Sequence, residues 1–125
     1  MMERRKHSRV SVRLPLEYCE TDNACHGALV GNVSEMGLLI YSTKKIPVGT
    51  HLLVTVFFNS GYEFDGFQAR ARIVWSDHYY EEEWLAYQYG LEFTGIPAED
   101  RHKLVSLLES QISLEYTDGK HQEIT

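Results

Sequence analysis

Residues 10–18 read Val10-Ser11-Val12-Arg13-Leu14-Pro15-Leu16-Glu17-Tyr18. Apolar and polar residues alternate through this stretch with a period of two, which is typical of a β-strand with one buried face. Pro15 has no N–H to donate, so we expect this strand to lie at the edge of a sheet or to contain a bulge. The first regular element of the chain is therefore predicted to be a β-strand.

Short stretches of the same character follow, and turn-forming residues separate them. The further predicted strands are residues 24–33, 38–42, 52–58, 66–76 and 87–93. Residues 77–83 are acidic and rich in tyrosine, and we expect them to form a loop.

The period changes after Pro97, where apolar residues fall on one face of a helix that we expect to end near Leu114. These residues are Leu104, Val105, Leu108 and Ile112. The sequence therefore predicts an all-β dominated fold, namely a six-stranded antiparallel β-barrel with a C-terminal α-helix. The predicted organisation is a basic N-terminal arm over 1–10, a barrel plus helix over 11–114, and a polar tail over 115–125.

The 125 residues are enough for one domain with a modest core. No apolar run approaches the roughly 20 residues that span a bilayer. The charged N-terminus lacks the apolar stretch of a signal peptide. We therefore expect a cytoplasmic protein without membrane insertion.

The charge is unevenly distributed. Residues 1–13 contain five cationic side chains against Glu3, a local charge of +4, although the whole chain carries −6. A small basic arm on an acidic body suits a compact anionic ligand better than a long polyanion. We therefore expect no DNA or RNA partner.

Two short motifs carry the chemistry. In the first, Arg5 and Arg9 supply two planar guanidinium groups, which match phosphate oxygens and the O6 and N7 atoms of guanine. About 23 residues later, Asn32-Val33-Ser34-Glu35-Met36-Gly37 supplies short polar side chains beside a permissive glycine. Asn32 and Ser34 are two residues apart, so on an extended backbone they would share one side.

The two motifs together resemble the signatures of the PilZ domain family, the bacterial receptor module for cyclic di-GMP. The stretches at 71–75 (Ala-Arg-Ile-Val-Trp) and 89–93 (Tyr-Gly-Leu-Glu-Phe) are also similar to family features, and the resemblance covers roughly residues 3–112. It implies the same order of arm, six-stranded barrel and helix. It also implies a non-enzymatic receptor that needs no cofactor and binds cyclic di-GMP as its ligand.

The resemblance also implies the roles of single residues. Arg5 and Arg9 would contact the ligand, and Asn32 and Ser34 would contact a guanine edge. Gly37 would adopt a backbone conformation closed to other residues or allow the ligand to approach.

Three further residues are less constrained. Arg4 precedes the arginine pair, a position that the family associates with two intercalated ligand molecules, but a solvated basic residue is the alternative. Trp75 is a secondary candidate for contact with a guanine. Arg9 and Arg13 have the same spacing as Arg5 and Arg9, but Arg13 falls within the alternating strand, and we interpret it as a solvated residue.

Other chemistries lack support in the sequence. There is no glycine-rich phosphate loop, nucleophile elbow or His-Glu-x-x-His motif, so we expect no catalytic residues. Cys19, Cys25 and His26 have no fourth ligand at zinc-finger spacing, and we expect neither a metal site nor a disulfide.

Two alternatives to the cyclic di-GMP receptor remain open. One is a receptor for a mixed guanine–adenine cyclic dinucleotide, and the other is a PilZ-like adaptor that acts by protein contact alone. In the favoured interpretation, the ligand orders the arm, and the protein then signals to an unidentified protein partner in motility or biofilm regulation.

Overall fold

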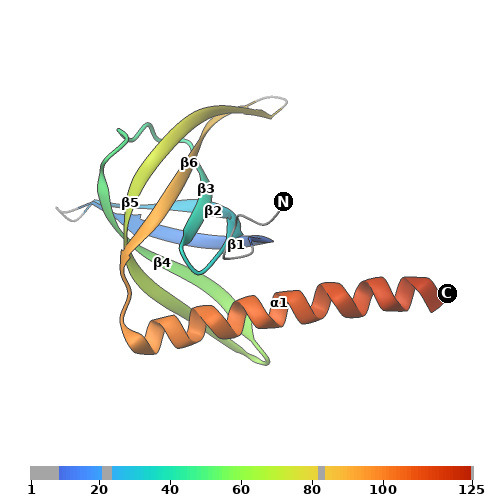
Figure 1. The fold of residues 1–125 in the computed structure, drawn as a ribbon. Coiled ribbons are helices and arrows are strands. Elements are labelled where there is room, and N and C mark those ends of the chain that lie inside the picture. Colours follow the sequence, from blue (N-terminus) through green and yellow to red (C-terminus); the bar gives the residue numbers. More distant parts are fainter. Residues whose placement is uncertain (1–8, 21–23, 82–83, 125) are drawn as a thin grey trace, which may run out of the picture.

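The computed structural model describes the backbone of residues 9–20, 24–81 and 84–124, and the side chains within 9–20, 24–78 and 86–111. This part of the chain forms six β-strands followed by one α-helix (Figure 1). The elements are β1 (Val10–Cys19), β2 (Cys25–Val33), β3 (Gly37–Ser42), β4 (His51–Ser60), β5 (Glu63–Glu81), β6 (Trp84–Gly95) and α1 (Ala98–Ile124).

The strands close into a barrel in the order β1-β2-β3-β6-β5-β4, and every neighbouring pair is antiparallel. Closure pairs the strand edges that would otherwise be open to association. The predicted six-stranded antiparallel barrel with a C-terminal helix is therefore confirmed.

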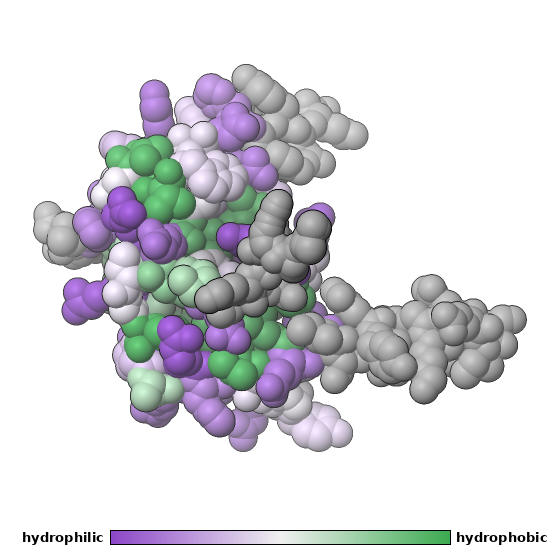
Figure 2. Space-filling model, viewed as in Figure 1, coloured by the Kyte–Doolittle hydropathy of each residue, from purple (hydrophilic) through white to green (hydrophobic). Residues whose placement is uncertain are grey.

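The barrel interior is filled by the residues that the alternation of the sequence marks as apolar. In β1, for example, Val10, Leu16 and Tyr18 are buried, whereas Ser11 and Arg13 between them are exposed. On the face shown in Figure 2, hydrophobic side chains form small patches that hydrophilic residues separate. The alternation thus assigns one face of each strand to the core and the other to the surface.

Pro15 lies beside an irregularity in β1. The register between β1 and β2 shifts between Ser11 and Leu14. Pairing of β1 with β4 is confined to Leu16–Cys19. The bulge that Pro15 predicted is therefore present, although the closed barrel gives β1 a neighbour on each side.

Helix α1 packs against β5 and β1 and buries Leu104, Leu107 and Leu108. The carboxylate of Asp100 in its first turn accepts a hydrogen bond from Gln68 N of β5 at 3.1 Å. The helix continues to Ile124, about ten residues beyond the predicted end, because no proline interrupts the segment. Within the described residues, no helix combines the length and apolar character needed to cross a membrane.

The predicted loop over 77–83 is wrong. Strand β5 continues to Glu81 and β6 begins at Trp84, so the hairpin extends as a curved ribbon away from the barrel (Figure 1). Tyrosine and tryptophan residues favour strands, and here that preference outweighs the acidic composition.

The expectation about the cysteines is also wrong, since Cys19 and Cys25 form a disulfide. The two residues lie directly opposite each other where β1 and β2 meet, with Cα atoms 4.1 Å apart. The strand register, which spacing alone does not reveal, brings the two sulfur atoms together.

Candidate functional site

Arg9 and Asn32 join the two sequence motifs. Arg9 directly precedes β1, and its Nη1–H donates a hydrogen bond to Asn32 Oδ1 at 2.7 Å. The strand register explains this contact, because Ser11 of β1 lies opposite Asn32 of β2. The bond leaves the other N–H groups of the guanidinium and the amide NH₂ of Asn32 as donors. An anion or a base edge placed beside this pair would meet several donors at once.

Ser34 shapes the turn that follows Asn32. Its side chain is buried, and its Oγ accepts hydrogen bonds from Met36 N at 3.1 Å and Gly37 N at 3.3 Å. Its backbone N–H donates to Gly37 O at 3.0 Å. Strand β2 ends at Val33, so Asn32 and Ser34 do not lie on the same side of an extended backbone. Asn32 is half-buried at the surface, whereas Ser34 is buried and stabilises the turn.

Gly37 is required by close packing between strands. A Cβ atom at this position would lie 1.9 Å from the carbonyl oxygen of Leu91 in β6. The positive φ angles in the described residues belong to Gly49 and Gly61, so Gly37 does not need an unusual backbone conformation. The motif glycine thus allows β3 to approach β6, and Phe93 N donates to Met36 O at 2.8 Å beside it.

The same turn is also connected to the helix. Glu35 Oε1 lies 3.9 Å from Arg101 Nη1, and both side chains are about half-exposed. An exposed ion pair of this kind contributes little to stability. It does place the first turns of α1 beside the Asn32–Gly37 motif.

A row of paired residues connects Asn32 with Trp75 across the outside of the barrel. Asn32 pairs with Leu39, Leu39 with Gly90, and Gly90 with Trp75. Three strand spacings of about 4.8 Å separate the ends of this row, which gives about 14 Å along the surface. The path from Asn32 to Trp75 therefore runs over the outside of the barrel through β3 and β6.

Trp75 lies within β5 and not at its end, and 44% of the side chain is exposed. Its indole covers Gly90, where a Cβ atom would lie 2.1 Å from the indole Nε1. The β5–β6 register shifts between Ile73 and Trp75, a bulge that leaves both Val74 and Trp75 exposed. Bulges often re-aim side chains near functional sites, and this one directs an aromatic surface outward.

An open groove of about 950 Å³ lies over β1, β2 and β3, away from the row that leads from Asn32 to Trp75. It is lined by Ser11, Arg13, Gly31 and Tyr41 among others. The sequence did not single out Gly31 or Tyr41. Tyr41 could have been found from the alternation of β3, in which it is an outward aromatic residue two positions after Leu39.

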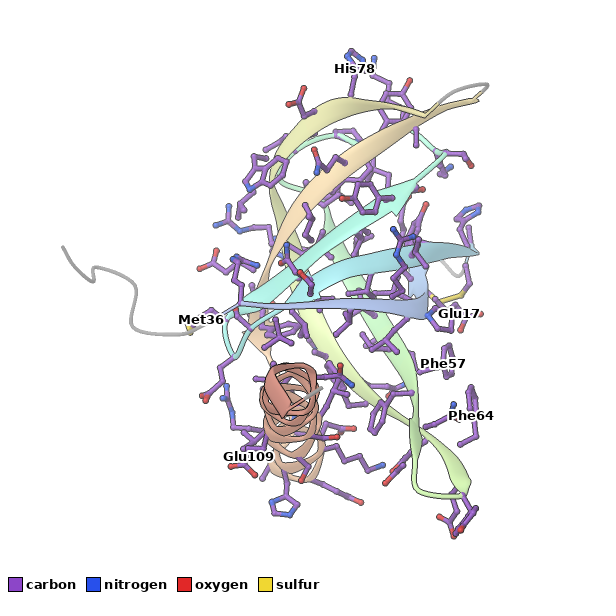
Figure 3. The ribbon with its side chains drawn as sticks, turned by 90° about the vertical axis from the view of Figure 1, so that its right-hand side faces the viewer. Glu17, Met36, Phe57, Phe64, His78 and Glu109 are labelled. Carbon is purple, nitrogen blue, oxygen red and sulfur yellow. A yellow bond between two sulfur atoms is a disulfide. The ribbon has the colours of Figure 1, made fainter. Side chains whose placement is uncertain are left out.

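The structure thus brings Arg9, Asn32, Ser34 and Gly37 together where β2 turns into β3. Trp75 lies farther away on β5 and is connected to them only through the pairing of β3, β6 and β5. Arg4 and Arg5 lie outside the described residues, so their roles stay predictions. Figure 3 shows Met36 of the motif turn and Glu17 at opposite ends of the β1–β2 pair, which locates the site at the Met36 end. Among the described residues, no group of His, Cys, Asp and Glu side chains could hold a metal ion.

Solved structures with the same fold include the following three bacterial proteins. The PilZ domain of YcgR from Escherichia coli, solved with c-di-GMP, has a TM-score of 0.76 and 12% identity, over 94% of this chain and 98% of that chain. The Bacillus subtilis inhibitor of motility (MotI/DgrA) has a TM-score of 0.73 and 16% identity, over 90% of this chain. The K. pneumonia MrkH–c-di-GMP complex has a TM-score of 0.71 and 10% identity, over 94% of this chain.

This chain covers 53% of the inhibitor of motility and 56% of MrkH, so it spans about half the length of those proteins. No curated protein sequence matches it significantly. The family model of the PilZ domain matches residues 3–110, which is most of the chain. This chain therefore belongs to the PilZ domain family.

Proposed function

We propose that this chain is a non-enzymatic receptor for cyclic di-GMP. The observation that carries the proposal is the contact between Arg9 and Asn32 on the outer face of the barrel, in a row that ends at Trp75. Cyclic di-GMP carries two phosphates and two guanines, and a guanidinium can contact both kinds of group. The c-di-GMP complexes of YcgR and MrkH, which share this fold, support the choice of ligand.

In this proposal each residue has a distinct role. Arg5 and Arg9 contact phosphates or guanine edges, and Asn32 contacts a guanine edge. Ser34 and Gly37 hold Asn32 in place through the turn and the close contact with β6. Trp75 offers an aromatic surface to a base.

Ligand binding would also order the arm. Clustered positive charge repels itself, and ligand phosphates would remove that repulsion and hold residues 4–9 against the barrel. The Glu35–Arg101 pair places α1 beside the same turn, so a change there would reach the helix. A partner protein that recognises the ordered arm or the helix would receive the signal.

Calorimetry with purified protein, cleared of carried-over nucleotide, tests the function. We expect binding of cyclic di-GMP that weakens as salt rises, because charge contacts are screened. A panel with cyclic di-AMP and the mixed guanine–adenine dinucleotide separates the alternative receptor. Absence of heat with all three at tens of micromolar would leave the protein-contact adaptor as the function.

Hydrogen exchange tests the ordering of the arm. Amides of residues 5–10 should gain protection when saturating cyclic di-GMP is added, while the core strands keep the protection they have. Equal protection of the arm in both conditions would show that the binding site is preformed.

A further inference from the structure

The groove beside Asn32 continues the proposed site in a direction that the two motifs do not cover. It begins at Ser11, the cross-strand partner of Asn32, and extends over β1, β2 and β3, with Gln111 of α1 also in its lining. Its volume of about 950 Å³ is within the range of small-molecule sites. A ligand held at Asn32 could therefore place its other half here.

Arg13 gives the groove a cation. It is exposed on the same outer face of β1 as Ser11, and the alternation of the strand places Arg9 on that face as well. Arg13 makes no hydrogen bond or ion pair with another residue of the described part of the chain. Its guanidinium is thus available to an anion in the groove, a role that goes beyond our interpretation of Arg13 as a solvated residue.

Tyr41 gives the groove an aromatic surface. Its ring lies over Gly31, where a Cβ atom would meet the ring carbon Cε2 at 2.6 Å. The Tyr41 hydroxyl lies 3.5 Å from Gln88 Nε2 on β6, which restricts the ring at its far end. Gly31 thus leaves space that allows the ring to lie close to the sheet and to line the groove.

Asn32 has both residues as diagonal neighbours. Arg13 lies two positions beyond Ser11 on one side of Asn32, and Tyr41 lies two positions beyond Leu39 on the other side. Diagonal neighbours on one face of a sheet are separated by about 7–8 Å. The register of β1 with β2 and of β2 with β3 shifts at this point, and Gly27 and Gly31 line the groove together with Arg13 and Tyr41.

We propose that this groove is a second base and phosphate subsite, in which Tyr41 stacks on the guanine remote from Asn32 and Arg13 contacts a phosphate. The proposal rests on the proposed cyclic di-GMP receptor function and assigns it two further residues. A ring of two nucleotides carries a second purine and a second phosphate, and the groove offers one group suited to each.

The test measures cyclic di-GMP affinity of four variants by calorimetry. Tyr41→Leu should weaken binding about five- to 150-fold, the range for loss of one base–aromatic stack, while Tyr41→Phe should retain most of it. Arg13→Gln should weaken binding about tenfold or more and reduce its salt dependence. Arg70→Gln, an exposed arginine of β5 outside the groove, should bind like the parent protein.

Nuclear Overhauser contacts between the Tyr41 ring and guanine H8 give a readout that does not depend on affinity. One outcome would overturn the groove proposal and leave the receptor function intact. In it, Arg13→Gln and Tyr41→Leu bind cyclic di-GMP with parental affinity, while Arg9→Ala binds it weakly. Absence of binding by the parent protein would overturn both.

Discussion

Arg9 and Asn32 are 23 residues apart in the sequence and share a hydrogen bond of 2.7 Å at the surface of the barrel. One residue enters β1 from the basic arm, and the other precedes the turn between β2 and β3. The bond connects the junction of the arm to the turn that Ser34 holds. It therefore makes the two motifs one structural unit, and a substitution of either partner tests that unit.

Arg9→Ala should weaken cyclic di-GMP binding by about tenfold to 150-fold, since charge-assisted hydrogen bonds contribute about 1.5–3 kcal/mol. The thermal stability should change little, because Arg9 is exposed. Calorimetry and thermal unfolding measure the two quantities, and Arg70→Ala is the matched control. If Arg9→Ala binds cyclic di-GMP with parental affinity, Arg9 does not contact the ligand.

Trp75→Ala should weaken binding by about 1–3 kcal/mol if the indole stacks on a base, whereas Trp75→Phe should lose less. The neighbouring exposed residue Val74 provides the control variant Val74→Ala. In a Trp84→Phe background Trp75 is the only tryptophan, and its fluorescence should change on adding the ligand. An unchanged emission together with parental affinity of Trp75→Ala would show that the indole serves only to cover Gly90.

Gly37→Ala should destabilise the barrel by about 1–3 kcal/mol or more, because the new methyl group would collide with the Leu91 carbonyl oxygen and separate β3 from β6. The matched control is Gly27→Ala, where the nearest atom to the new Cβ would be 4.0 Å away. Urea unfolding of both variants gives the difference in free energy. Equal stabilities would contradict the packing role of the motif glycine.

Much of the fold could be predicted from the sequence because alternation reports burial directly. Val10, Leu16 and Tyr18 are buried as their positions in the pattern indicate. The β5–β6 ribbon and the Cys19–Cys25 bond could not be predicted. Both depend on pairing between strands, which composition and spacing along a single segment do not report.

The candidate site was predicted in part. Asn32 and Arg9 were identified from their motifs and do meet. The turn role of Ser34 was missed, because a buried hydroxyl that accepts two backbone N–H groups cannot be distinguished in sequence from one that faces a ligand. The alternation of β3 marks Tyr41 as an outward aromatic residue, but its position beside Asn32 follows only from the register of β2 and β3.

The Cys19–Cys25 disulfide should stabilise the β1–β2 hairpin modestly. A cross-link over a sequence separation of 6 closes a short loop, for which the chain-entropy model gives about 2 kcal/mol. The paired variant Cys19→Ser with Cys25→Ser should lose about that amount in urea unfolding. The parent protein in reductant should match the paired variant, and a parent protein whose stability is insensitive to reductant would contradict a contribution from the bond.

Tyr89→Phe should lower the stability by about 1–3 kcal/mol at neutral pH, because the buried hydroxyl accepts from Ile46 N at 2.7 Å and donates to Lys44 O at 2.9 Å. The control Tyr62→Phe changes a fully exposed residue and should have no effect.

Burial raises the pKa of Tyr89 above its ordinary value of 10.0. Its protonated form is therefore favoured in the folded state, and this stabilisation is complete below about pH 10 and lost as pH rises through the raised pKa. Urea unfolding between pH 8 and pH 11 should accordingly show a smaller alkaline loss of stability in Tyr89→Phe than in the parent protein, and identical slopes would show that Tyr89 is not the group that titrates.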